Sequence, residues 1–322
     1  MPIALAPPRD LTVPEPGSTT ARDVLSSALG RAMREARAAV RGHPMLGHIE
    51  PGALASLVRR ARVGVLVRAL RSATDVEAIR SELVATMLGE LSGSGSHESV
   101  PIEEPIVLAL ADNNPLAMHE AHPDKQGNAL DLGGRPPSEW VAALREALHI
   151  VRSHLPDLRA EMDLYVQQIV PVGFFADRHL SASYREAIGT LYLSLHPSPM
   201  TMVEALVHEF QHNKLNALLE SDDVLENAHE PLYRSPVRPD ARPLHGVLLA
   251  VHAFVPVALL YERMIAAGDA RASVAPHRRL GEIARINREG TDVLRAHARP
   301  TPVGRAILDE LFRWDRHFAP PL

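Results

Sequence analysis

Apolar residues along the 322-residue chain recur mainly every three or four positions, which is the spacing of amphipathic helices. A clear example runs from Thr20 to Val40, where valine, leucine, alanine and methionine fall on one side. Further helices are predicted over residues 51–70, 75–91, 138–155, 203–219 and most of 244–316, with breaks near Gly268 and Pro300. The chain is therefore expected to be mainly helical.

Two segments have the character of β-strands instead. Residues 190–195 alternate three leucines with Tyr192 and Ser194, the period of two that is typical of a half-buried strand. Residues 164–170 form a second strand-like run, and residues 106–110 a short third one. A small sheet among many helices predicts an α+β fold.

Composition along the chain predicts three regions. Residues 1–20 are rich in proline, serine and threonine, so we expect an extended or disordered lead-in. Residues 92–96 alternate serine and glycine, which is typical of a flexible linker and indicates a boundary. We therefore expect a helical arm or subdomain over residues 21–91 and the main, catalytic domain over residues 97–322.

The main candidate for chemistry is His-Glu-Phe-Gln-His at residues 208–212, inside the apolar run 203–219. Histidines four apart on a helix lie on one face, so His208 and His212 can reach a single metal ion. No glycine or proline interrupts the run, so the helical context that this HExxH motif requires is met. The alternative is a partly exposed helix with ordinary histidine hydrogen bonds, but the apolar neighbours favour burial, where polar groups need partners.

A useful metal site needs a third ligand and an open position. In the extended zincin motif a glycine stands three residues after the second histidine, and the third histidine follows three residues later. Those positions are Leu215 and Leu218 in this chain, so that form is excluded. The third ligand is therefore expected from a second helix.

This second helix is predicted to begin at Leu244 and carries His245 and His252, seven residues apart on one face. His252 lies deeper in the apolar run, and Pro256 should bend the helix beside it, so His252 is the predicted third ligand. His245 lies where the helix begins and is expected to face the substrate. The alternatives left open are a core role for His252 and ligation by Glu262, Glu220 or Glu226.

Arginines and prolines alternate between the two helices, over residues 233–243. The prolines stiffen this segment, and guanidinium groups suit carboxylates because they offer paired N–H donors. The segment can therefore hold an acidic cosubstrate or a peptide carboxylate. A proline-rich surface loop with solvated arginines is the alternative.

The overall composition argues against several kinds of partner and of functional site. The formal net charge is −5, so no basic field argues for nucleic acid or an anionic membrane as a partner. The absence of cysteine excludes disulfides, thiolate metal sites and cysteine nucleophiles. The apolar stretch Leu244–Tyr261 contains two histidines and a proline, which favours a buried core helix over a bilayer span. The N-terminal residues do not have the pattern of a secretory signal, so we expect a cytoplasmic protein of undetermined oligomeric state.

Several of these segments together resemble a known family. His-Glu-Phe-Gln-His-Asn-Lys-Leu at 208–215 is followed at 235–248 by Ser-Pro-Val-Arg-Pro-Asp-Ala-Arg-Pro-Leu-His-Gly-Val-Leu. It is preceded by Ser-Ala-Ser-Tyr at 181–184 and by Gly-Thr-Leu-Tyr-Leu-Ser at 189–194. The combination resembles the HExxH-type 2-oxoglutarate-dependent peptide β-hydroxylases that are associated with ribosomal peptide natural products.

The resemblance implies iron(II) and 2-oxoglutarate as cofactors, and hydroxylation of an unactivated carbon in a peptide substrate that can carry a leader segment. It implies that His208 and His212 ligate iron and that Arg238 or Arg242 anchors 2-oxoglutarate. Our expectation for the fold is a zincin-like core with a small sheet, the HExxH helix and a second ligand-bearing helix.

Two other functions stay open. In a zinc metallopeptidase Glu209 would be the general base that activates the attacking water. In a hydroxylase no hydrolytic base is required, so Glu209 would orient a ligand or a bound water. The third possibility is a binding module without a metal.

Overall fold

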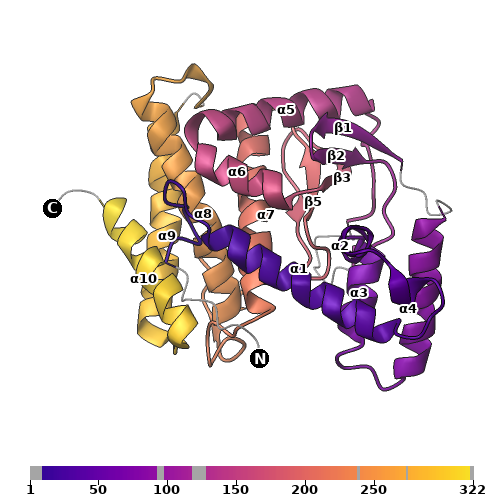
Figure 1. Ribbon diagram of the computed structural model, residues 1–322. Helices are drawn as coiled ribbons and strands as arrows, with labels where there is room; N and C mark the ends of the chain where they lie inside the picture. Colours follow the sequence, from indigo (N-terminus) through magenta and orange to yellow (C-terminus); the bar gives the residue numbers. More distant parts are fainter. Residues whose placement is uncertain (1–8, 93–97, 118–127, 238–239, 273–274, 320–322) are drawn as a thin grey trace. The chain divides into compact units, whose positions relative to one another are not determined.

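The computed structural model describes residues 9–92, 98–117, 128–237, 240–272 and 275–319 (Figure 1). Within these residues the chain has ten α-helices and a small mixed sheet, which confirms the predicted α+β class. It divides into two compact units that interleave along the sequence. Unit 1 takes the described residues up to Val24, residues 146–162 and those from Ser198 onward, and unit 2 takes residues 25–145 and 163–197.

Unit 2 begins with a cluster of helices. They are most of α1 (Thr20–Ala39), η1 (Leu46–His48), α2 (Pro51–Val58), α3 (Ala61–Ala69) and α4 (Val76–Leu91). The single helix predicted over residues 51–70 is broken, because Arg60 has extended backbone angles (φ −70°, ψ 127°) between α2 and α3. α4 follows Asp75, whose carboxylate accepts the backbone N–H of Ala78 as an N-cap. The apolar faces of these helices form one buried cluster.

The sheet of unit 2 has five strands in the order β1-β2-β3-β5-β4. They are β1 (Ser99–Glu103), β2 (Ile106–Ala109), β3 (Gln168–Phe174), β4 (Ser181–Ala182) and β5 (Thr190–Leu195). The central strands β2, β3 and β5 are parallel, and each outer strand is antiparallel to its neighbour. The prediction that residues 190–195 are half-buried is wrong, because the whole of β5 is buried. Tyr192 tolerates this burial because its hydroxyl donates to Asp112 at 3.0 Å and accepts from Asn114 at 2.9 Å.

Like α1, two further helices are shared by the units, since the division also runs through α5 (Pro137–His154) and α6 (Pro156–Tyr165). α5 matches the predicted helix to within a residue at each end. It ends before Pro156, as expected because a proline disfavours helical angles in the residue that precedes it. In unit 2 the indole N–H of Trp140 donates to the carbonyl of Leu132 at 3.1 Å, which attaches the start of α5 to the preceding loop.

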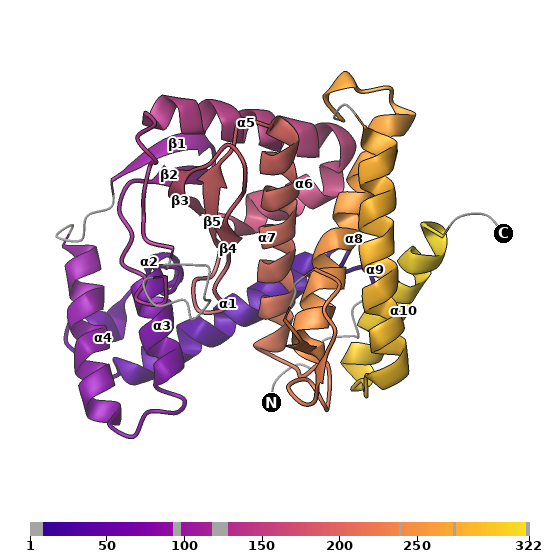
Figure 2. The same cartoon turned by 180° about the vertical axis from the view of Figure 1, so that it is seen from behind.

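Unit 1 is mainly helical. Its elements are α7 (Pro199–Leu219), β6 (Leu232–Tyr233), β7 (Arg242–Pro243), α8 (Leu244–Ala266), η2 (Ala270–Ala272), α9 (Pro276–His297) and α10 (Pro302–His317). α8 contacts α7, α9 and α10, and Figure 2 shows it between α7 and α9. Gly290 lets α9 approach α8 closely, since a Cβ there would lie 2.4 Å from a methyl carbon of Val251. α8 is long and apolar enough to cross a membrane by length and composition alone, but 78% of its apolar window is buried, as expected of a core helix.

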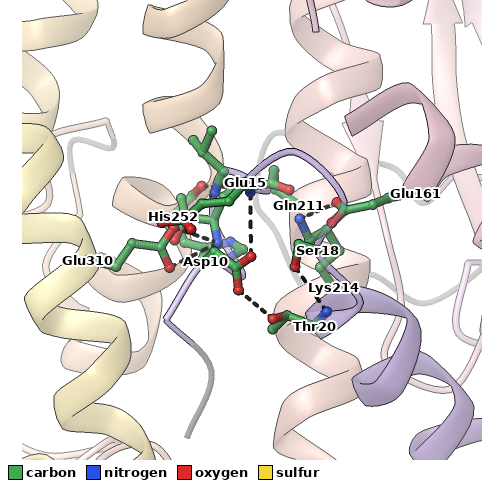
Figure 3. A network of polar contacts seen from close by, with 11 residues as sticks. Asp10, Glu15, Ser18, Thr20, Glu161, Gln211, Lys214, His252 and Glu310 are labelled. Atoms are coloured by element: carbon green, nitrogen blue, oxygen red, sulfur yellow. Dashed lines mark hydrogen bonds and ion pairs between the residues drawn. The ribbon is translucent and has the colours of Figure 1, made fainter. Parts of the chain in front are cut away.

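The N-terminal segment, Asp10–Val13, is packed inside unit 1, although we expected an extended or disordered lead-in. Leu11 and Thr12 are 0% exposed. The backbone N–H groups of Thr12 and Val13 donate to the carboxylate of Glu310 on α10, at 3.1 and 3.0 Å (Figure 3). These N–H groups have no strand or helix to pair with, so the buried carboxylate satisfies them instead. Burial raises the pKa of Glu310 to about 7, although both N–H groups oppose this effect.

We predict that Glu310 contributes stability that is lost as the pH rises from about 4.5 to about 7. The carboxyl has a higher pKa in the folded state (about 7) than its ordinary value of 4.5, so the folded state binds the proton more tightly and loses this advantage as the pH rises. A shift of this size corresponds to about 3 kcal/mol. Denaturant unfolding of Glu310→Gln across this pH range should therefore show a flatter pH dependence. Asp309→Asn, exposed on the same helix, is the control, and equal slopes for Glu310→Gln and the wild type would contradict the prediction.

Candidate metal centre

α7 places both histidines of the HExxH motif on one helical face. The helix begins after Ser198, whose hydroxyl accepts the N–H of Thr201 at 3.4 Å, and Pro199 is its first residue. It continues unbroken to Leu219, so His208 and His212 lie one turn apart as predicted.

His208, Glu209 and His212 form a group whose potential ligand atoms all lie within 4.8 Å of one another. The two imidazole rings are 4.4 Å apart and nearly perpendicular. Both histidines are half-buried, whereas Glu209 is only 3% exposed, and its Oε2 has no hydrogen-bond partner. A buried, unpaired carboxylate oxygen is costly in a protein interior, so a cation is favoured beside it. The group can therefore supply two imidazoles and one carboxylate to a metal while leaving one side open.

The predicted third ligand, His252, does not join this group. The side chain of α8 that contacts the motif is Phe254, whose ring lies 4.8 Å from that of His208. Two positions along a helix correspond to a rotation of about 200°, so His252 points away from Phe254. His252 is fully buried in a different polar cluster, near Gln211 and Glu310 (Figure 3). The third residue of the group is Glu209, and ligation by His252 stays a prediction.

Of the other candidates, His245 is not part of the group, and Arg242 has an acidic partner of its own. His245 lies at the start of α8, as predicted, with its ring 5.7 Å from that of His229. Arg242 lies in β7 and forms an ion pair with Asp240 at 2.8 Å. Arg238 lies outside the described residues.

The glutamates considered as alternative ligands lie outside the His208 group. Glu262 pairs with His317 of α10 at 2.9 Å. Glu220 is the C-cap residue of α7, and the backbone N–H of Glu226 donates to the carbonyl of Arg299 at 2.9 Å. None of the three belongs to the His208 group.

Sequence reasoning missed a polar contact one turn before His208. Glu204 accepts a hydrogen bond from the hydroxyl of Tyr261 at 2.7 Å and two from Arg279, at 3.0 and 2.5 Å. Burial first, and then the charge of Glu204, raises the pKa of Tyr261, so its hydroxyl stays protonated. This contact joins α7, α8 and α9 at the level of the motif. The sequence feature that could have revealed this contact is the four-residue spacing between Glu204 and His208, which puts both side chains on one face of the helix.

A second missed feature lies around Gln211 and Lys214 of α7 (Figure 3). Lys214, one of two lysines in the chain, is 0% exposed and pairs with Glu161 of α6 at 2.5 Å. Gln211 donates to the backbone carbonyls of Thr12 at 2.7 Å and His252 at 3.3 Å. Burial first, and then the charge of Lys214, lowers the pKa of His252 well below its usual range, so this imidazole is neutral. A lysine and a glutamine within an apolar helix indicated that both side chains have polar partners inside the protein. Which residues these partners are depends on the tertiary structure.

Comparison with other proteins does not assign a family. No protein-family model matches the chain, and no curated protein matches its sequence. Functional conclusions therefore rest on the geometry of the site and on the motifs themselves.

We predict that His208→Ala and His212→Ala each reduce bound metal from about one equivalent to near zero, because each variant loses an imidazole ligand. His252→Gln should retain about one equivalent, since His252 is outside the ligand group. Metal analysis after loading with zinc, or with iron(II) without oxygen, measures this. His277→Ala, exposed on α9, is the control. Full occupancy in both motif variants would rule out the site.

Proposed function

We propose that the protein is an iron(II) and 2-oxoglutarate-dependent hydroxylase that acts on a side chain of a ribosomally made peptide. The observation that carries this proposal is the close group of His208, Glu209 and His212. Two imidazoles and one carboxylate with open positions are the donor set of non-haem iron(II) oxygenases. The sequence resemblance at residues 208–215 and 235–248 supports the same reaction and supplies the substrate class.

Each residue of the group has a defined task in this proposal. His208 and His212 bind the metal through ring nitrogens, and Glu209 completes the donor set. Phe254 packs on the ring of His208 and limits its rotation, which keeps the ligand oriented. Iron(II) held by these residues would let dioxygen and 2-oxoglutarate react together, so that one oxygen atom of O2 would enter a C–H bond of the peptide and the other would enter succinate, with release of carbon dioxide.

The proposal also includes an arginine anchor for the distal carboxylate of 2-oxoglutarate. Arg238 and Arg242 are the candidates, since a guanidinium group can form a paired contact with a carboxylate. The side chain of Arg242 is 34% exposed, and Asp240 competes for it. We further infer that α7 and α8 form the helical part of a zincin-like core, and that the protein acts in the cytoplasm on a peptide that can carry a leader.

A zinc metallopeptidase is the second candidate, and Glu209 favours it. Its unpartnered oxygen lies in the same group as the two histidines. A carboxylate in this position can accept a proton from an attacking water instead of binding the metal. A binding module without a metal is the third candidate.

The deciding experiment incubates iron-loaded protein with 2-oxoglutarate, oxygen and candidate peptides, preferably a precursor peptide encoded beside its gene. We expect succinate in proportion to a peptide that is heavier by one oxygen atom. Zinc-dependent peptide cleavage without cosubstrate would replace the proposal with the peptidase. Absence of metal binding would favour the module.

We predict that the activity of the Glu209→Gln variant distinguishes a hydroxylase from a peptidase. Glutamine is nearly isosteric with glutamate and still offers an oxygen, so a hydroxylase should keep a reduced but measurable activity. A peptidase should lose turnover while its metal stays bound, because glutamine cannot accept the proton. Product formation and metal content are measured on the same samples, with His277→Ala as the control. Complete loss of hydroxylation with full metal content would contradict a simple ligand role for Glu209.

A further inference from the structure

The side chain of Gln211 connects three separate parts of unit 1. Its amide nitrogen donates to the backbone carbonyl of Thr12 in the N-terminal segment at 2.7 Å and to that of His252 in α8 at 3.3 Å (Figure 3). Both partners are acceptors, so only the nitrogen of the amide can face them. All three residues are 0% exposed, so bulk solvent does not reach them. We call this pair of hydrogen bonds the Gln211 bridge.

Pro256 explains why α8 offers a carbonyl at this point. In a regular helix the carbonyl of His252 accepts the backbone N–H four residues later, but that residue is Pro256, which has no N–H. A buried carbonyl without a donor is costly. Gln211 supplies a donor from α7. The hydrogen bond that the proline removes within α8 is therefore replaced by one between two helices.

The N-terminal segment has a similar need. The buried residues around Thr12 belong to no helix or strand, so their backbone groups have no regular partners. Glu310 of α10 accepts the N–H groups of Thr12 and Val13, and Gln211 donates to the Thr12 carbonyl. Side chains from two helices therefore satisfy this backbone, and the side chain of Gln211 also bonds to α8.

We propose that Gln211 is a positioning residue of the metal centre, which fixes the rotation of α7 against α8 and the N-terminal segment. Gln211 directly precedes His212 and lies three residues after His208. A metal ligand must be held to within about 0.5 Å, and a rotation of α7 would move both imidazoles out of that geometry. The Gln211 bridge itself needs no metal, so only its effect on the two histidines rests on the proposed function.

A double-mutant cycle tests the link between Gln211 and Pro256. Gln211→Met has nearly the same size but no donor, so its melting temperature should fall by at least about 4 °C. Pro256→Ala returns an N–H to the His252 carbonyl. In that background Gln211→Met should cost only about half as many degrees, since only the Thr12 carbonyl loses its donor. Equal losses in both backgrounds would overturn the role of Pro256. Gln211→Asn, which is one methylene group shorter, replaces Gln211→Met if that variant does not fold.

Zinc affinity tests the positioning role. Gln211→Met should bind zinc about tenfold more weakly than the wild type, as is typical when support behind a ligand is lost. Leu308→Ala, buried on α10, is the control, because it lowers stability through lost apolar volume rather than a lost hydrogen bond. It should keep the zinc affinity of the wild type. Unchanged affinity in Gln211→Met, or an equal loss in Leu308→Ala, would overturn the positioning role. If the wild type binds no zinc, the proposed function fails, and the double-mutant cycle still decides the Gln211 bridge.

Discussion

The burial of polar side chains in α7 is the constraint on which the rest of unit 1 depends. Glu209, Gln211, Asn213 and Lys214 are each no more than 3% exposed, on a helix surrounded by apolar residues. A buried polar group without a partner costs about 1–3 kcal/mol, and a charged one costs more. Asn213 donates to the carbonyl of Glu209 at 3.2 Å, and Lys214 pairs with Glu161. Gln211 donates to the backbone of the N-terminal segment, and Glu209, in our proposal, binds a metal.

Two neighbouring faces of α7 therefore have different tasks. One face presents His208 and His212, which are half-buried, and Glu209 belongs to the same group. Gln211, three residues after His208, is buried and joins the N-terminal segment to α8. Because both faces belong to one helix, the packing around Gln211 helps to set where the proposed ligands stand. The N-terminal segment is thus part of the structure that supports the site.

Several local features followed from the sequence, and others did not. The helical spacing of apolar residues predicted α7 and α8, and the motif spacing predicted the shared face of His208 and His212. The alternation in residues 190–195 predicted a half-buried strand, yet Asp112 and Asn114 satisfy the Tyr192 hydroxyl inside the protein. Alternation shows which residues share a face of a strand, but only the neighbouring elements decide whether the polar face meets water.

The sequence by itself determined that α7 can offer two imidazoles to one metal, because helix geometry relates residues four apart without any other part of the chain. It could not determine how α8 is rotated about its axis. Packing decides that rotation, since Val251 lies against Gly290 while Phe254 meets His208. With this rotation His252 lies outside the group of His208, Glu209 and His212, although the charge of His212 still acts on its ring. Likewise, only the folded chain brings Thr12 to Gln211, because a contact across 199 positions depends on tertiary packing rather than on local spacing.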